Sequence, residues 1–156
     1  MTYEVSDAEV KQAQTPHNLF ISGLFMFDLL MTPAVIGLEL GMLGMLIPLL
    51  CSSALITFIY LRSRKNTTSA FVDAHWRLAY AHGRWLMIAY GVSAALIFFA
   101  WLLSLSTHDA NMGHILWTAL TRIALLPTLI MVMVTAVMEA SAIGSATKRE
   151  TPTKNN

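Results

Sequence analysis

Residues 66–85 of the chain read NTTSAFVDAHWRLAYAHGRW, and they form the one long polar interruption between two strongly apolar halves. The stretch gathers two histidines, two arginines and an aspartate. Each apolar half is long enough to cross a membrane twice. We therefore predict four transmembrane helices, with residues 66–85 as the one sizeable region between crossings.

The composition indicates that lipid, rather than water, surrounds most of the chain. Hydrophobic residues make up 56% of the 156 residues and charged residues 12%, whereas charged residues make up about 25% of a typical soluble domain. The formal net charge is +1, whereas a nucleic-acid-binding protein generally displays a concentrated basic face. We expect a single integral membrane domain over residues 1–156, with no nucleic-acid partner.

Cys51 is the only cysteine in the chain. An internal disulfide and a two-cysteine metal or redox motif are therefore excluded. The polar N-terminal segment lacks the basic and short apolar regions of a cleaved signal peptide. We expect the first crossing itself to direct insertion into the membrane.

The first apolar half extends over 43 residues, from 19 to 61. A single helix of this length would measure about 65 Å, roughly twice the hydrocarbon thickness of a bilayer, so two crossings are required. The glycine-rich residues 37–44 are the predicted turn between them. We expect the crossings at residues 18–38 and 42–61.

The segment before the first crossing carries two helix-start signals. Ser6 and Glu9 form a capping-box pattern, which predicts a short helix over residues 7–14 outside the membrane. Thr15 followed by Pro16 is an N-cap followed by a proline at the first helical position, and this pair predicts the start of the membrane helix.

The second apolar half begins with a helix that can run unbroken over residues 70–105, a length of about 54 Å. This exceeds the bilayer, so we expect residues 70–84 to form a cytoplasmic amphipathic extension and residues 85–105 to cross. The fourth crossing is predicted over residues 114–143.

The distribution of basic residues predicts the orientation. With four crossings and cytoplasmic polar tails at residues 1–15 and 147–156, nine of the ten Lys and Arg residues fall on the cytoplasmic side. The tenth, Arg122, lies within the fourth crossing. The predicted fold is an all-α bundle of four transmembrane helices with both termini in the cytoplasm.

Ionisable residues inside a membrane are expensive, so they mark functional or structural sites. Asp28 and Arg122 are predicted at similar depth, and we expect them to pair across the first and fourth helices. The pair would either fix the register of the bundle or mark a proton or substrate site. Glu139 lies near the inner end of the fourth helix, where it either extends to cytoplasmic water or meets Arg84 or His82.

Pro33, Pro48 and Pro127 fall inside three of the predicted crossings. Each proline removes one helical hydrogen bond and leaves the carbonyl four residues earlier without its usual donor. We therefore expect kinks at these three positions.

The residues before the third crossing suggest two kinds of contact. His75 and His82 are two helical turns apart, too far to share a metal ion directly, so no metal site is expected. His17 is predicted at the depth of His82, and together they offer the two axial ligands of a b-type haem. The other interpretation is that the polar and aromatic side chains meet lipid headgroups or a partner protein. These side chains are Asp73, His75, Trp76, Arg77, His82 and Arg84.

The order His75-Trp76-Arg77 resembles the His-aromatic-Arg segment of a group of small uncharacterised bacterial inner-membrane proteins with several helices. The resemblance covers about 30 residues, and those proteins are often shorter. It implies a helical protein of the bacterial inner membrane and assigns no site.

We expect a multi-pass, non-enzymatic inner-membrane subunit or scaffold, without a cofactor, whose helix 70–84 contacts lipid headgroups or a larger membrane complex. One alternative is a redox membrane anchor in which His17 and His82 bind haem b, with quinone nearby. The other alternative is a small transporter that works as a homo-oligomer, with Asp28 or Glu139 as the coupling carboxylate.

Overall fold

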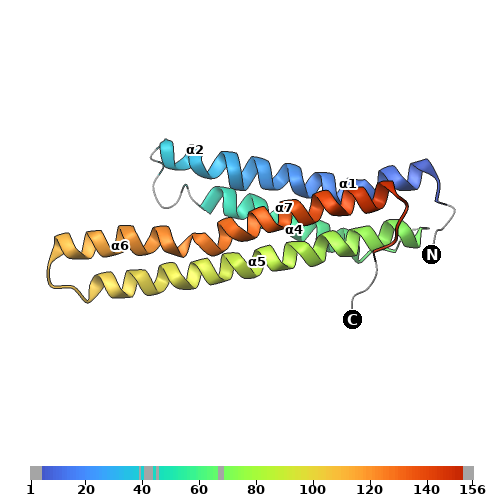
Figure 1. The fold of residues 1–156 in the computed structure, drawn as a ribbon. Helices are drawn as coiled ribbons and strands as arrows, with labels where there is room; N and C mark the ends of the chain where they lie inside the picture. Colours follow the sequence, from blue (N-terminus) through green and yellow to red (C-terminus); the bar gives the residue numbers. More distant parts are fainter. Residues whose placement is uncertain (1–4, 39, 41–43, 45, 67–68, 153–156) are drawn as a thin grey trace. The chain divides into compact units, whose positions relative to one another are not determined.

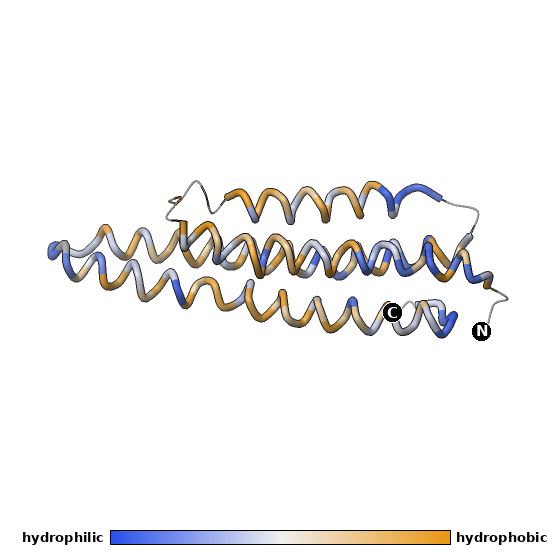
Figure 2. The backbone as a smooth tube through the Cα atoms, turned by 90° about the horizontal axis from the view of Figure 1, so that it is seen from above, coloured by the Kyte–Doolittle hydropathy of each residue, from blue (hydrophilic) through white to orange (hydrophobic). Residues whose placement is uncertain are grey.

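The computed structural model describes residues 5–38, 40, 44, 46–66 and 69–152. All regular structure within these residues is helical, and no strand occurs among them. Four helical segments are long and apolar enough to cross a membrane, namely Asp7–Val35, Leu46–Ser63, Ala70–Leu105 and Asn111–Thr147. Hydrophobic residues dominate the middle of these segments (Figure 2). The all-helical fold with four membrane-length helices is therefore confirmed, and the placement of both termini in the cytoplasm stays a prediction.

The chain divides into two compact units. Figure 1 shows the course of the chain through its helices. The first unit comprises Met1–Arg84 and Thr135–Asn156, and the second comprises Trp85–Val134. Two long helices, α5 (Ala70–Leu105) and α7 (Leu126–Thr147), contribute residues to both units. Each unit is described by itself below.

The first unit begins with α1 (Asp7–Gly23), which starts at a capping box. The Ser6 hydroxyl accepts a hydrogen bond from the Glu9 amide, and the Glu9 carboxylate accepts one from the Ser6 amide at 2.9 Å. The predicted start at Thr15 and Pro16 is wrong, because Pro16 lies inside α1 and the Thr15 hydroxyl donates to the Lys11 carbonyl. The capping box thus begins one continuous helix rather than a separate short one.

A π-helix, η1 (Leu24–Met31), follows α1 directly and leads into α2 (Thr32–Gly37). The Thr32 hydroxyl donates to the Phe27 carbonyl at 3.1 Å. Pro33 has no backbone N–H to donate. The Thr32 hydroxyl supplies a donor to a carbonyl of the widened turn just before it. The helix α2 ends at Gly37, where the predicted turn at residues 37–44 begins, and residues 39 and 41–43 of that turn lie outside the described residues.

The helix α4 (Leu46–Ser63) carries Pro48 in its first turn. The hydrogen bond that Pro48 is predicted to remove would involve the Gly44 carbonyl, and residues 41–43 and 45 lie outside the described residues, so this loss stays a prediction. Two glycines bring α4 close to its neighbours. A Cβ on Gly23 of α1 would lie 2.0 Å from Leu55, and a Cβ on Gly83 of α5 would lie 3.0 Å from Ile56.

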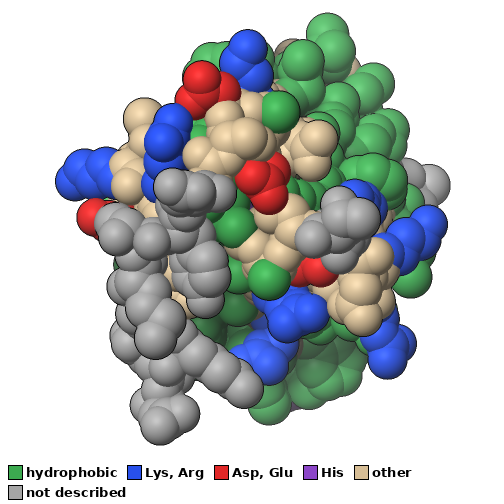
Figure 3. Space-filling view, turned by 90° about the vertical axis from the view of Figure 1, so that its right-hand side faces the viewer, with side chains coloured by type: hydrophobic (Ala, Val, Ile, Leu, Met, Phe, Trp, Pro, Cys, Tyr) green, Lys and Arg blue, Asp and Glu red, His purple; other side chains and the backbone are tan. Residues whose placement is uncertain are grey.

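Charged residues gather at one end of the first unit, where α1 and α5 begin and α7 ends (Figure 3). There the Arg149 guanidinium lies 2.8 Å from the Asp7 carboxylate, and the Gln14 amide donates to the Thr147 hydroxyl at 2.9 Å. These contacts join the last turn of α7, and Arg149 just after it, to α1. They hold the two chain-terminal helices of the unit side by side.

The second unit contains the later part of α5, the helix α6 (Ala110–Ala124) and the start of α7. The Asp109 carboxylate caps α6 by accepting a hydrogen bond from the Asn111 amide at 2.9 Å. The Thr128 hydroxyl donates to the Ser93 hydroxyl at 2.9 Å and so joins α7 to α5. The predicted single helix over 114–143 is interrupted at Leu125, two residues before Pro127, which removes an amide donor from the helix.

Candidate functional site

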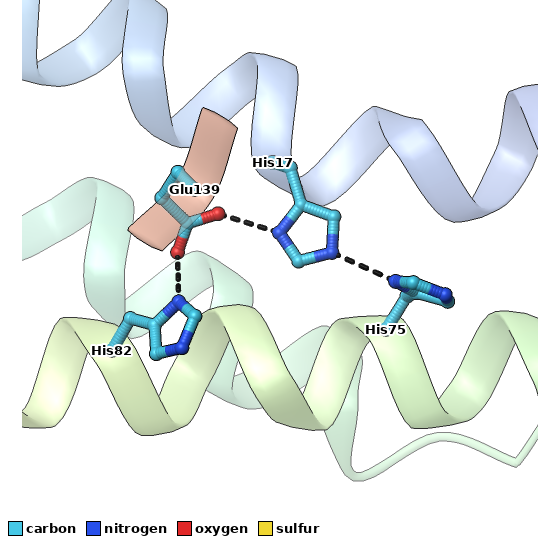
Figure 4. A network of polar contacts seen from close by, with 4 residues as sticks. All are labelled: His17, His75, His82 and Glu139. Carbon is cyan, nitrogen blue, oxygen red and sulfur yellow. Dashed lines mark hydrogen bonds and ion pairs between the residues drawn. The ribbon is translucent and has the colours of Figure 1, made fainter. Parts of the chain in front are cut away.

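Four ionisable side chains form a buried cluster inside the first unit (Figure 4). Glu139 on α7 is fully buried, and each of its carboxylate oxygens contacts a histidine. Its Oε2 lies 2.5 Å from Nδ1 of His17 on α1, and its Oε1 lies 2.8 Å from Nδ1 of His82 on α5. One carboxylate therefore connects three helices.

His75 extends this cluster by one further contact. Its Nδ1 lies 3.0 Å from Nε2 of His17, and both rings are fully buried. Nε2 of His75 has no hydrogen-bond partner among the described residues, although the ring interacts with the backbone of Glu150. The contacts thus form a chain that runs from His82 through Glu139 and His17 to His75.

The spacing on α5 explains why this chain needs four members. His75 and His82 are seven residues apart, about 10 Å along one face of the helix. This spacing is the reason why the sequence predicts that the two histidines do not share a metal ion. Glu139 and His17, from the two helices that pack beside α5, bridge the distance. The four side chains therefore form a linear series in which each neighbouring pair shares one hydrogen bond.

One assignment of hydrogens satisfies all three contacts with neutral histidines. His75 donates from Nδ1 to Nε2 of His17, and His17 donates from Nδ1 to Oε2 of Glu139. His82 donates from Nδ1 to Oε1 of Glu139. In this state the cluster carries one negative charge, and one added proton makes it neutral.

The burial of Glu139 distinguishes between the two predicted positions of its side chain, in water or against Arg84 or His82. A side chain with no exposed surface does not extend to water, so Glu139 is not an interfacial anchor. It meets His82, which was one of the predicted partners. The contact with His17 was not predicted, although His17 and His82 were expected at the same depth.

The other residues predicted to contact lipid or a partner are divided by the structure. Asp73 and Trp76 are 6% exposed, and His75 and His82 lie in the buried cluster, so the burial of these four gives that prediction no support. Trp76 packs inside the first unit with the Arg62 guanidinium 5.3 Å from its ring centre. Arg77 and Arg84 are exposed and remain accessible to a headgroup or a partner.

Asp28 and Arg122 lie in different units. Asp28 is part of η1, where its carboxylate accepts a hydrogen bond from the Ser52 hydroxyl of α4 at 3.2 Å. Arg122 is in the last turn of α6 in the second unit. Their mutual ion pair stays a prediction.

The buried contacts of His17 compete with haem ligation, which stays a prediction. Both of its ring nitrogens are engaged, one by Glu139 and the other by His75. Binding to iron would require His17 to give up one of these buried contacts. Within the described residues there is also no group of three or more His, Cys, Asp or Glu side chains with the geometry to hold a metal ion.

No protein-family model matches the chain, and comparisons with curated proteins and with solved structures found no match. The functional argument therefore depends on the cluster itself.

Proposed function

We propose that this chain is a proton-translocating transporter of the bacterial inner membrane, and that the cluster around Glu139 binds the transported proton. The observation that carries the proposal is the fully buried Glu139 carboxylate held by Nδ1 of His17 and Nδ1 of His82. A carboxylate and histidines inside a membrane-length bundle are costly, and such chains commonly serve as proton relays.

The tautomers of the cluster define how a proton would move. A proton that arrives at Nε2 of His75 releases the hydrogen of Nδ1 to Nε2 of His17. His17 then passes its Nδ1 hydrogen to Oε2 of Glu139. The proton count balances: one proton enters at His75 and one carboxylic acid forms at Glu139. The reverse sequence releases the proton.

His82 provides a second entry to the same carboxylate. A proton that binds at Nε2 of His82 allows the Nδ1 hydrogen to move to Oε1 of Glu139. Glu139 is thus the shared acceptor of two hydrogen-bonded approaches. The three side chains that meet there, His17, His82 and Glu139, come from α1, α5 and α7. A change in the charge of Glu139 therefore alters the preferred packing of these three helices.

Two measurements on the full-length chain test this function. Infrared difference spectra recorded between alkaline and acidic buffer should show the carbonyl band of a protonated acid, and Glu139→Gln should remove it. Liposomes that contain the protein should lose an imposed pH gradient faster than empty liposomes, and Glu139→Gln should slow the loss to the level of empty liposomes. Asp7→Asn, which changes an exposed carboxylate outside the cluster, is the control.

The proposal fails if the Glu139 carboxyl takes up no proton between the alkaline and the acidic buffer. It also fails if the carboxyl does take up a proton but the liposomes keep their gradient, because the cluster would then be structural.

A second candidate is the subunit or scaffold role, which the exposure of Arg77 and Arg84 on α5 favours. These side chains are free of the buried cluster and match anionic headgroups or an acidic partner surface. In native membranes, the double substitution Arg77→Gln and Arg84→Gln should release any copurifying partner. Unchanged copurification would exclude a partner contact through these arginines.

A further inference from the structure

A cavity of about 400 Å³ lies on the first unit beside the buried cluster. Four apolar side chains, His82 and two serines form its wall: Leu78, His82, Val137, Met138, Ser141, Ala142 and Ser145. Its volume is near the lower end of the range for small-molecule sites, about 300–1,000 Å³. Val137 is 70% exposed, so the cavity is open at the surface of the unit.

His82 connects this cavity to the proton site. Its Nδ1 contacts Glu139, which has no exposed surface, while 9% of the His82 side chain remains exposed. Figure 4 shows the second ring nitrogen on the edge of His82 turned away from Glu139. One nitrogen of His82 therefore contacts the buried carboxylate, and among the described residues His82 is the one titratable side chain in the cavity wall.

The charge of the wall selects the class of ligand. His82 can add only positive charge, and the remaining wall residues are neutral. Ser141 and Ser145 are four residues apart on α7, so their hydroxyls lie on one face and can donate to an oxygen. Glu139 lies behind His82 and has no exposed surface, so a ligand in the cavity contacts the carboxylate only through the His82 ring.

We infer that the cavity binds a small monocarboxylate with an apolar body, and that binding is coupled to uptake of one proton by the His82 and Glu139 pair. The protonated His82 donates from Nε2 to the ligand carboxylate while Nδ1 continues to donate to Glu139. Carboxylate, imidazolium and carboxylate then form a line of two charge-assisted hydrogen bonds. The apolar wall contacts the body of the ligand.

This inference deepens the proposed function, on which it rests for the proton, by naming the class of substrate that would move with it. By linkage, a ligand that favours the protonated cluster must also bind more tightly when the cluster is protonated. The transport cycle would then carry a weak organic acid and a proton together.

Calorimetric titration of the full-length chain with benzoate tests the inference, with benzamide as the neutral analogue. In two buffers of different ionisation enthalpy at neutral pH, benzoate should bind with uptake of close to one proton, and benzamide should bind at least about tenfold more weakly. His82→Gln should weaken benzoate binding by about tenfold or more. His108→Gln, an exposed histidine of the second unit, should leave it unchanged.

A second variant separates the cavity from the cluster. Ser141→Leu places an apolar side chain in the cavity wall without removing a member of the cluster, and it should abolish benzoate binding while the infrared band of Glu139 remains. This variant keeps the test open if His82→Gln does not fold.

Several results would overturn the inference. They are absence of benzoate binding, equal binding of benzamide, or unchanged binding in Ser141→Leu. Loss of benzoate binding when anionic phosphatidylglycerol is added to the micelles would instead identify a lipid-headgroup site. None of these results contradicts the proposed proton site. Absence of the infrared band of protonated Glu139 in the unmodified protein would contradict that site itself.

Discussion

Glu139 Oε2 and His17 Nδ1 lie 2.5 Å apart although 122 residues separate them in the chain, and neither side chain has any exposed surface. The contact joins the first helix of the first unit to the last one. It also fixes the tautomer of His17, since the nitrogen that faces Glu139 must carry a hydrogen while the carboxylate is ionised. The structure of the unit and its proposed proton chemistry thus depend on the same bond.

Replacement of His17 by alanine tests the structural part of this relationship. The substitution leaves Glu139 with one fewer donor and removes the partner of His75 Nδ1. Loss of a hydrogen bond to a buried carboxylate, together with the cavity left by the imidazole ring, costs about 2–5 kcal/mol. We expect a large drop in the thermal midpoint of the detergent-solubilised protein. His108→Ala, at an exposed position, should melt like the unmodified protein, and equal midpoints for both variants would contradict the prediction.

Replacement of Glu139 by glutamine tests the role of the charge. The amide keeps the shape of the side chain but can accept through only one of its two polar atoms, so one histidine must change its tautomer or lose its bond. We expect a cost of about 1–3 kcal/mol in the free energy of unfolding. This is smaller than the cost of His17→Ala because the amide still fills the site. A larger loss of stability in Glu139→Gln than in His17→Ala would contradict this order.

The helices were predictable from the sequence because apolar length is a local property that each segment carries by itself. The whole of α5, for example, was expected over residues 70–105, and the structure has the same bounds. The break at Leu125 lies two residues before Pro127, where the sequence predicts a kink. The start of α1 was misplaced because two start signals, at Ser6 and at Thr15, compete and only one can begin a continuous helix.

The cluster was only partly predictable. The sequence predicts His17 and His82 at the same depth along the membrane normal, because depth can be counted in residues from the ends of a helix. Glu139 was predicted near the inner end of its helix, and His82 was one of its expected partners. Which helices lie side by side is not encoded in depth, so the bridging role of Glu139 and the place of His75 required the three-dimensional packing.

Two glycines on α5 offer a matched test of helix packing. A Cβ on Gly83 would lie 3.0 Å from both Ile56 and Phe20, whereas a Cβ on Gly91 would meet nothing within 4 Å. We expect Gly83→Val to destabilise the protein by about 1–3 kcal/mol through overpacking. Gly91→Ala should stabilise it by about 0.5–1 kcal/mol, because alanine favours a helix more than glycine does. Chemical or thermal unfolding of both variants in the same detergent measures the contrast, and the reverse order would contradict the packing of α5 against α1 and α4.

The predicted ion pair between Asp28 and Arg122 is testable by a double-mutant cycle. Asp28 already accepts a hydrogen bond from Ser52, so Asp28→Asn retains an acceptor for that hydroxyl and removes mainly the charge. If the two residues pair, the effects of Asp28→Asn and Arg122→Gln on the free energy of unfolding should differ from additivity by more than about 0.5 kcal/mol. The pair Asp28→Ala and Ser52→Ala serves as a positive control, because each of these substitutions removes the hydrogen bond between the two side chains. Additive effects for Asp28 and Arg122, together with coupling for Asp28 and Ser52, would show that the carboxylate is held within the first unit and that Arg122 has a separate role.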